Sequence, residues 1–252
     1  MIKNFLVEYR REISEIKKYK FNLLFSNIKL LITFYAVTRF LMAEEREILF
    51  FILFCWYFVS KGFLIPSYIM EGEISDKTLL SIVQSKTSVA IVLCTRCLVT
   101  LAVDFLKALV FFGLLALVGN FDFSFLSWNI AFSLVSAMLM VIVSSYLVGF
   151  FVSLLSMRFK RATSIVSLLS YWILFFSGLT LPAGNNFFTQ SVALLLPFQA
   201  FRSMMEMMVQ GMDHSAFLSL IVTKFLLWSL VSAISLMYLS KQLIKKEYIY
   251  HV

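Results

Sequence analysis

Long apolar runs divide this 252-residue sequence into lengths that fit a membrane. A helix needs about 20 consecutive apolar residues to cross the hydrocarbon core of a bilayer. Six runs reach or approach that length, at about residues 21–42, 48–67, 98–118, 128–155, 163–181 and 216–239. An apolar stretch from Val89 precedes the third run and leaves room for an earlier helix start. The pattern predicts one all-α domain over residues 1–252, a polytopic membrane protein with six transmembrane helices.

The composition agrees with a lipid environment. Only 14% of the residues are charged, whereas about a quarter are charged in soluble domains. The net charge of +8 would suit nucleic acid, but the basic residues gather at the ends of the runs, where membrane topology requires them. We therefore expect the lipid bilayer, and no nucleic acid, as a partner. A charged segment precedes the first run and no small-residue cleavage pattern follows it, so we expect no cleaved signal peptide.

The distribution of Lys and Arg predicts the orientation. Fifteen of the 22 lie in the N-terminal segment, the second and fourth connections and the C-terminal tail, with Lys61 counted in the second connection. The opposite connections hold only Arg46 and Arg202. Because basic residues concentrate on the cytoplasmic side, we expect a multi-pass cell-membrane protein with both termini in the cytoplasm.

The N-terminal segment, residues 1–20, has the pattern of an amphipathic helix. Its apolar residues recur at helical spacing on one face, whereas charged residues occupy the other; the apolar set is Phe5, Tyr9, Ile13 and Ile16. A helix of this kind lies in the membrane interface.

The stretch 71–86 is the longest polar interval between two apolar runs. Ser75 and Asp76 are favoured N-cap residues, and four apolar residues follow, namely Leu79, Leu80, Ile82 and Val83. The stretch predicts a short cytoplasmic helix that is capped at Ser75 or Asp76 and runs to about Gln84. An ordinary solvated loop is an equally weighted alternative.

The connection 182–215 is unusually apolar for an external loop. Pro182 precedes the apolar segment 191–201, which contains Pro197 and is too short to cross the membrane. We expect an external re-entrant helical pair, whose irregular backbone must be buried against protein; a surface loop is the alternative.

Polar residues share one face of the third run, at Arg96, Thr100, Asp104 and Lys107. Ionisable groups inside a membrane are costly and mark substrate or proton pathways, or pair with one another. We leave both readings open for Asp104 and Lys107, which form a ready i, i+3 pair. Small residues every four positions, at Ser145, Gly149 and Ser153, predict close helix packing.

The sequence lacks the common motifs of nucleotide-binding and catalytic sites. It has no P-loop, no H-E-x-x-H and no G-x-S-x-G pattern, and only two histidines. Cys94 and Cys97 form a C-x-x-C on an apolar helix, without the context of a redox or metal site. We expect no catalytic residues, no bound metal and no cofactor in this chain.

The order of these features resembles the membrane subunits of type-2 ATP-binding-cassette exporters. The resemblance rests on the interfacial helix, on Lys77-Thr78-Leu79-Leu80 after Glu71 and Glu73, on Arg96, and on the segment Phe176–Pro182 followed by Leu196-Pro197. That family has an acidic coupling helix with a Gly-Thr-Leu-Glu-like core, so Lys77 replaces Gly and Leu80 replaces Glu here.

The resemblance implies a non-catalytic permease that pairs with a second copy or a sister subunit. A separate P-loop ATPase would bind ATP and Mg and would dock on the coupling helix through Glu71, Glu73, Asp76, Lys77, Thr78 and Leu79. The chain lacks the Leu-Gly-x-x-Trp stretch of glycan exporters, which favours efflux of a peptide or an amphipathic drug-like substrate. The alternative is a stand-alone intramembrane enzyme or sensor that uses Arg96, Asp104 and Lys107.

Overall fold

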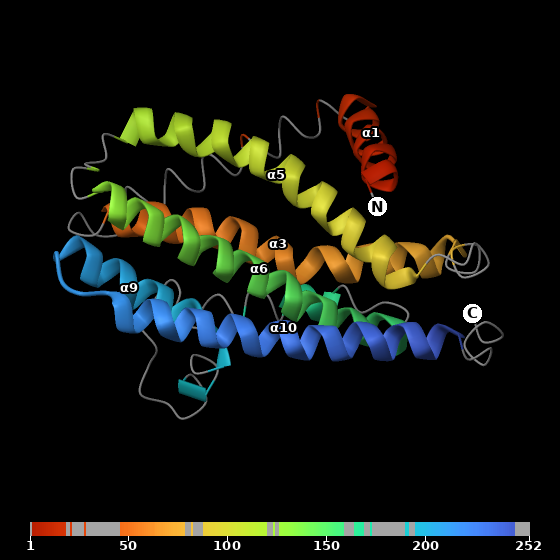
Figure 1. The fold of residues 1–252 in the computed structure, drawn as a ribbon. Coiled ribbons are helices and arrows are strands. Elements are labelled where there is room, and N and C mark those ends of the chain that lie inside the picture. The colour runs from red at the N-terminus through yellow and green to blue at the C-terminus, as the bar shows by residue number, and fades with distance from the viewer. Residues whose placement is uncertain are drawn as a thin grey trace.

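The computed structural model shows an all-helical chain (Figure 1). It describes residues 2–18, 46–78, 88–119, 126–158, 164–168 and 195–244, together with positions 21, 28, 82, 123, 172, 190 and 191. The helices are α1 (Ile2–Lys18), α3 (Arg46–Ser75), α5 (Val89–Gly119), α6 (Trp128–Arg158), α9 (Phe198–Val209) and α10 (Ser215–Ile244). The predicted all-α class is confirmed.

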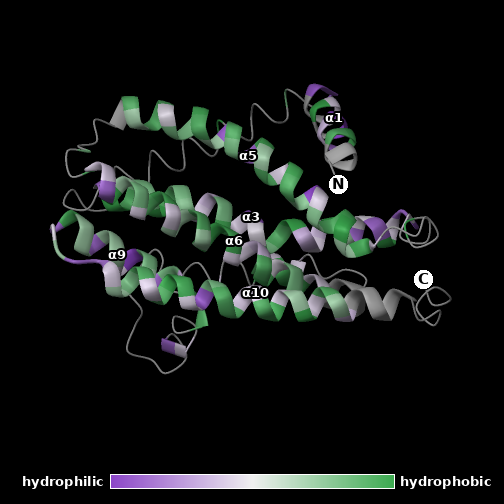
Figure 2. Ribbon diagram, viewed as in Figure 1, coloured by the Kyte–Doolittle hydropathy of each residue, from purple (hydrophilic) through white to green (hydrophobic). Residues whose placement is uncertain are grey.

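Four of these helices are long and apolar enough to cross a membrane: Glu47–Ser75, Val89–Leu117, Trp128–Ser153 and Ser215–Tyr238. Apolar residues cover them along most of their length (Figure 2). They match the second, third, fourth and sixth predicted spans, and the third does begin at Val89. Most of 21–42 and of 163–181 lies outside the described residues, so the first and fifth spans stay predictions. The protein is an α-helical membrane protein.

The helices form an elongated bundle around α3 and α6, which pack side by side. These two and α10 run in the same direction, whereas α5 runs the opposite way (Figure 1). The short α1 crosses the first half of α5. In consequence α1, the end of α3, the start of α5 and the end of α10 all lie at one end of the bundle, and α9 lies at the other.

The α3–α6 contact depends on small residues. Pro66 lies inside α3 and has no N–H, so the Gly62 carbonyl loses its usual helical donor. Gly149 of α6 lies against that carbonyl, because a Cβ at Gly149 would overlap the Gly62 oxygen. A Cβ at Gly62 would in turn overlap the hydroxyl of Ser145, which is fully buried, as is Ser153. The predicted packing role of this small-residue series is confirmed.

Helix α9 is built into the bundle. It begins directly after Pro197 and buries seven of its residues, among them Phe198 and Phe201, against α3, α6 and α10. The carbonyl of Leu196 just before it accepts a hydrogen bond from Lys224 Nζ of α10 at 2.9 Å. A surface loop is therefore wrong for residues 195–209. The re-entrant pair over 182–215 includes residues outside the described part and stays a prediction.

The start of α10 is fixed by a local cap. The Asp213 carboxylate accepts hydrogen bonds from the backbone N–H and the hydroxyl of Ser215, each at 3.0 Å. These bonds favour the ionised form, with the backbone bond foremost, so they lower the pKa of Asp213 below its ordinary value.

Candidate functional site

The end of α3 differs from the predicted short helix. Residues 71–75 continue α3 rather than begin a new helix, so the N-caps predicted at Ser75 and Asp76 are wrong. The Ser75 hydroxyl donates to the Gly72 carbonyl at 3.0 Å instead of accepting from a helix start. The reason is length. A 30-residue helix extends about 45 Å, so its polar end projects beyond a hydrocarbon core about 30 Å thick.

A Schellman turn terminates α3. The Thr78 N–H donates to the Glu73 carbonyl at 3.1 Å and the Lys77 N–H to the Ile74 carbonyl at 3.3 Å, the two bonds that define this motif. Lys77 takes the left-handed conformation the motif requires, with φ of 58°. Glycine normally fills that position because it has no Cβ.

Helical structure resumes after the turn. The Ile82 N–H donates to the Thr78 carbonyl at 3.1 Å, and Ile82 is helical. Leu79 and most of the remainder of 71–86 lie outside the described residues. The part of the coupling helix that would follow Thr78 therefore stays a prediction.

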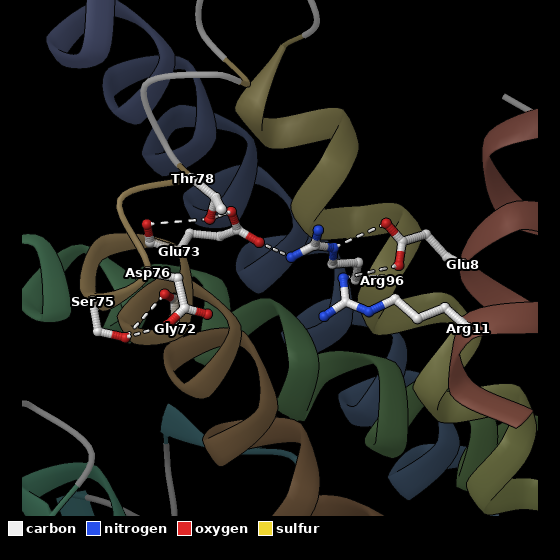
Figure 3. Close-up of polar contacts among 8 residues, drawn as sticks. All are labelled: Glu8, Arg11, Gly72, Glu73, Ser75, Asp76, Thr78 and Arg96. Atoms are coloured by element: carbon white, nitrogen blue, oxygen red, sulfur yellow. Dashed lines mark hydrogen bonds and ion pairs between the residues drawn. The ribbon is translucent and has the colours of Figure 1, made fainter. Parts of the chain in front are cut away.

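An ionic junction joins three helices beside this turn (Figure 3). Arg96, in the second turn of α5, forms an ion pair with Glu73 near the end of α3. Its Nε also donates to Glu8 of α1 at 3.1 Å. The Thr78 hydroxyl donates to the same Glu73 carboxylate, and Arg11 lies 3.8 Å from Glu8. The ionic junction thus comprises Glu8, Glu73, Thr78 and Arg96.

The junction is largely shielded from solvent. The side chains of Glu73, Arg96 and Glu8 are 9%, 20% and 23% exposed, whereas Arg11 is 59% exposed. Shielded charges interact more strongly than surface pairs. A planar guanidinium can also serve two carboxylates at once, which a lysine ammonium does less well. Arg96 therefore holds α1 and the end of α3 in fixed positions relative to α5.

A cavity of about 270 Å³ opens at the junction. Three junction residues line it together with other residues of α1, α3, α5 and the turn after α3, namely Glu8, Arg11, Tyr68, Ile69, Gly72, Glu73, Asp76, Arg96, Val99 and Thr100. No group of three metal-ligating side chains occurs within the part of the chain that the structure describes.

The predicted polar face of α5 separates into two sites. Arg96 belongs to the ionic junction, and Thr100 donates its hydroxyl to the Arg96 carbonyl at 3.0 Å. Asp104 is buried in the bundle and lies 3.4 Å from Lys107, as the i, i+3 spacing predicts.

The closer partner of Asp104 is Lys61 of α3, at 2.7 Å. Lys61 lies inside the spanning part of α3. Counting Lys61 among the basic residues of the cytoplasmic second connection was therefore wrong. The asymmetry of basic residues remains fourteen to two without it. Sequence reasoning missed this contact because periodicity identifies a face of one helix and does not identify the neighbour.

The predicted docking residues divide into two groups. Asp76, Lys77 and Thr78 are exposed. Glu71 is half-buried and Glu73 is buried in the junction. The Glu73 carboxylate faces Arg96, and the Thr78 hydroxyl also points to that carboxylate (Figure 3).

Comparisons with protein-family models, with curated proteins and with solved structures find no match to this chain.

Proposed function

We propose that this chain is the membrane subunit of an ATP-driven exporter of the type-2 ATP-binding-cassette class. The observation that carries the proposal is the ionic junction. It joins the N-terminal helix, the helix end that leads into the 76–88 connection, and the start of α5. A partner that displaces this connection would move three elements together. Energetic coupling between the ATPase surface and the membrane spans needs a structural element whose position both can change, and the three joined helices are such an element.

The turn at Lys77 gives independent support. The resemblance places a glycine of the family pattern at this position, and the backbone there has the left-handed conformation that favours glycine. Lys77 thus differs from the family glycine in its side chain, whereas its backbone conformation is the one that a glycine would adopt there.

The proposed docking surface for the ATPase comprises Glu71, Asp76, Lys77, Thr78 and Leu79. Acidic and polar groups there would orient the partner, and Leu79 would supply an apolar anchor, since a few residues usually dominate an interface. Glu73 would act indirectly, through Arg96. ATP and Mg would be bound by the partner, and this chain would contribute no catalytic group.

The proposed assembly holds two permease subunits, identical or sister, in the cell membrane. Each would have six spans, cytoplasmic termini and an external re-entrant segment that includes α9. In support, α10 exposes a long apolar face suited to lipid or to a second subunit, at Leu220, Leu226, Leu227, Leu230, Ile234 and Met237. The transported substrate would be a peptide or an amphipathic molecule.

A stand-alone enzyme or sensor based on Arg96, Asp104 and Lys107 is the weaker proposal. It needs those three side chains at one site, whereas Arg96 contacts Glu8 and Glu73, and Asp104 contacts two lysines. We therefore place transport first.

Co-purification tests the proposed function. The tagged permease is expected to retain a P-loop ATPase in detergent, and Leu79→Asp is expected to abolish that association because it puts a charge in the proposed apolar anchor. Val209→Asp is the matched control, since Val209 is 40% exposed and belongs to α9, the helix at the opposite end of the bundle. Size-exclusion chromatography verifies that both variants are folded. Full ATPase retention by a folded Leu79→Asp protein would overturn the proposed docking surface.

A further inference from the structure

The Asp104 cluster carries an excess of positive charge. One carboxylate with a 5% exposed side chain lies between two ammonium groups, those of Lys61 and Lys107. The lysine side chains are 31% and 25% exposed, so each keeps an accessible surface. Lys61 lies 14 residues into the span that begins at Glu47, roughly 20 Å along the helix, which places the cluster well inside the membrane.

Among the residues that the structure describes, Asp104 is the carboxylate that pairs with these two lysines. The sequence has 14 Asp and Glu residues, and Asp104 is the only one within any of the six apolar runs. Uncompensated charge inside a membrane is costly, and such groups pair or line a pathway. The two lysines therefore have the capacity to accept one further anionic group.

A large apolar cavity lies one aromatic contact away from the cluster, and the cluster's own side chains do not line it. It has a volume of about 540 Å³ and lies between α3, α5 and α6, with phenylalanines along its wall at Phe50, Phe51, Phe54, Phe105, Phe112 and Phe123. Phe112 is 6.3 Å, centroid to centroid, from the ring of Tyr57. Tyr57 accepts a hydrogen bond from Lys61 Nζ at 2.9 Å, and its ring lies 4.4 Å from that nitrogen. One aromatic residue thus links the cavity to the cationic group.

We propose that this composite site binds an amphipathic organic anion. Its apolar part fills the phenylalanine-lined cavity, and its single negative group lies between Lys61 and Lys107. The volume falls within the range of small-molecule sites. The inference rests on the proposed export function and deepens it by naming the charge of the substrate. An amphipathic cation would meet two ammonium groups and bind poorly.

Three pyrene probes of similar size separate charge from apolarity: pyrene-1-sulfonate, 1-pyrenemethanol and 1-pyrenemethylammonium. Each is titrated into the purified permease in phosphatidylcholine nanodiscs, with energy transfer from tryptophan as the readout and empty nanodiscs as the blank. The sulfonate is expected to bind at least tenfold more tightly than the alcohol, and the ammonium more weakly than both.

Lys61→Met and Lys107→Met are each expected to weaken sulfonate binding about tenfold and to leave alcohol binding unchanged. Each variant still leaves Asp104 one lysine partner, so if one fails to fold the other carries the test. Lys224→Met is the control, because this intramembrane lysine donates to the Leu196 carbonyl and does not line the cavity.

Equal affinities for the sulfonate and the ammonium would overturn the inference, as would unchanged sulfonate binding in a folded Lys61→Met or Lys107→Met protein. No ATPase is present in this binding assay. A negative result in the binding assay would therefore not bear on the ATPase docking surface, which the co-purification experiment tests separately.

Discussion

Lys77 holds a backbone conformation that lysine rarely adopts. With φ of 58° it closes the Schellman turn that ends α3. A residue with a Cβ in this region is strained by about 1 kcal/mol or more, and the strain persists because the two hydrogen bonds of the turn fix the backbone. A non-glycine residue kept in such a position is a reason to look for a role for its side chain, and Lys77 lies on the proposed docking surface.

Replacement of this lysine should stabilise the protein. We expect Lys77→Gly to raise the free energy of unfolding by about 1 kcal/mol, because glycine adopts a positive φ without steric cost. Denaturant titration of the purified protein in detergent measures the change. Lys77→Ala is the matched control, since it removes the charge and keeps the Cβ. If Lys77→Ala raised the free energy of unfolding equally, the lysine side chain rather than the backbone conformation would be the cause, and the backbone explanation would be wrong.

At the scale of the helices, the sequence predicted where the spans lie better than where each helix ends. The apolar runs predicted α3, α5, α6 and α10, including the early start of α5 at Val89. The polar residues 71–75 did not reveal that α3 continues through them, because polarity marks the membrane boundary rather than the helix end. The ionic junction was partly visible in the sequence: Glu8 and Glu73 were assigned to the cytoplasmic side and Arg96 to the third span, without any indication that they touch.

The strength of that junction can be measured by double-mutant cycles. We expect the Arg96–Glu73 pair to show a coupling free energy of about 2 kcal/mol, because both side chains are largely shielded and the bond is charge-assisted. The Arg11–Glu8 pair, 3.8 Å apart with an exposed arginine, is the comparison and should show less than about 1 kcal/mol. Thermal unfolding of the single and double alanine variants provides the values. Similar coupling for the two pairs would mean that Arg96 does not fix the three helices together.

At the scale of the whole molecule, the four spans and the buried helix α9 form a bundle with two different ends. One end gathers α1, the end of α3, the start of α5 and the end of α10, together with the ionic junction. The other end holds α9, anchored to α10 by Lys224 and Trp228, whose side chains donate to the Leu196 and Leu195 carbonyls. The composite anion site lies between these ends. Sequence predicted this polarity from charge alone, since basic residues concentrate at one set of connections.

The direction of the bundle in the membrane is the last prediction. If the junction end is cytoplasmic, as the fourteen-to-two distribution of basic residues predicts, a cysteine placed at Asp122 or Asn186 should react with a membrane-impermeant maleimide in intact cells. A cysteine at Asp76, which is exposed, should react only after permeabilisation, and this reaction controls for its accessibility. The three native cysteines are replaced first. The reverse labelling would invert the orientation, and it would place the proposed ATPase surface on the side of the membrane that holds no ATP.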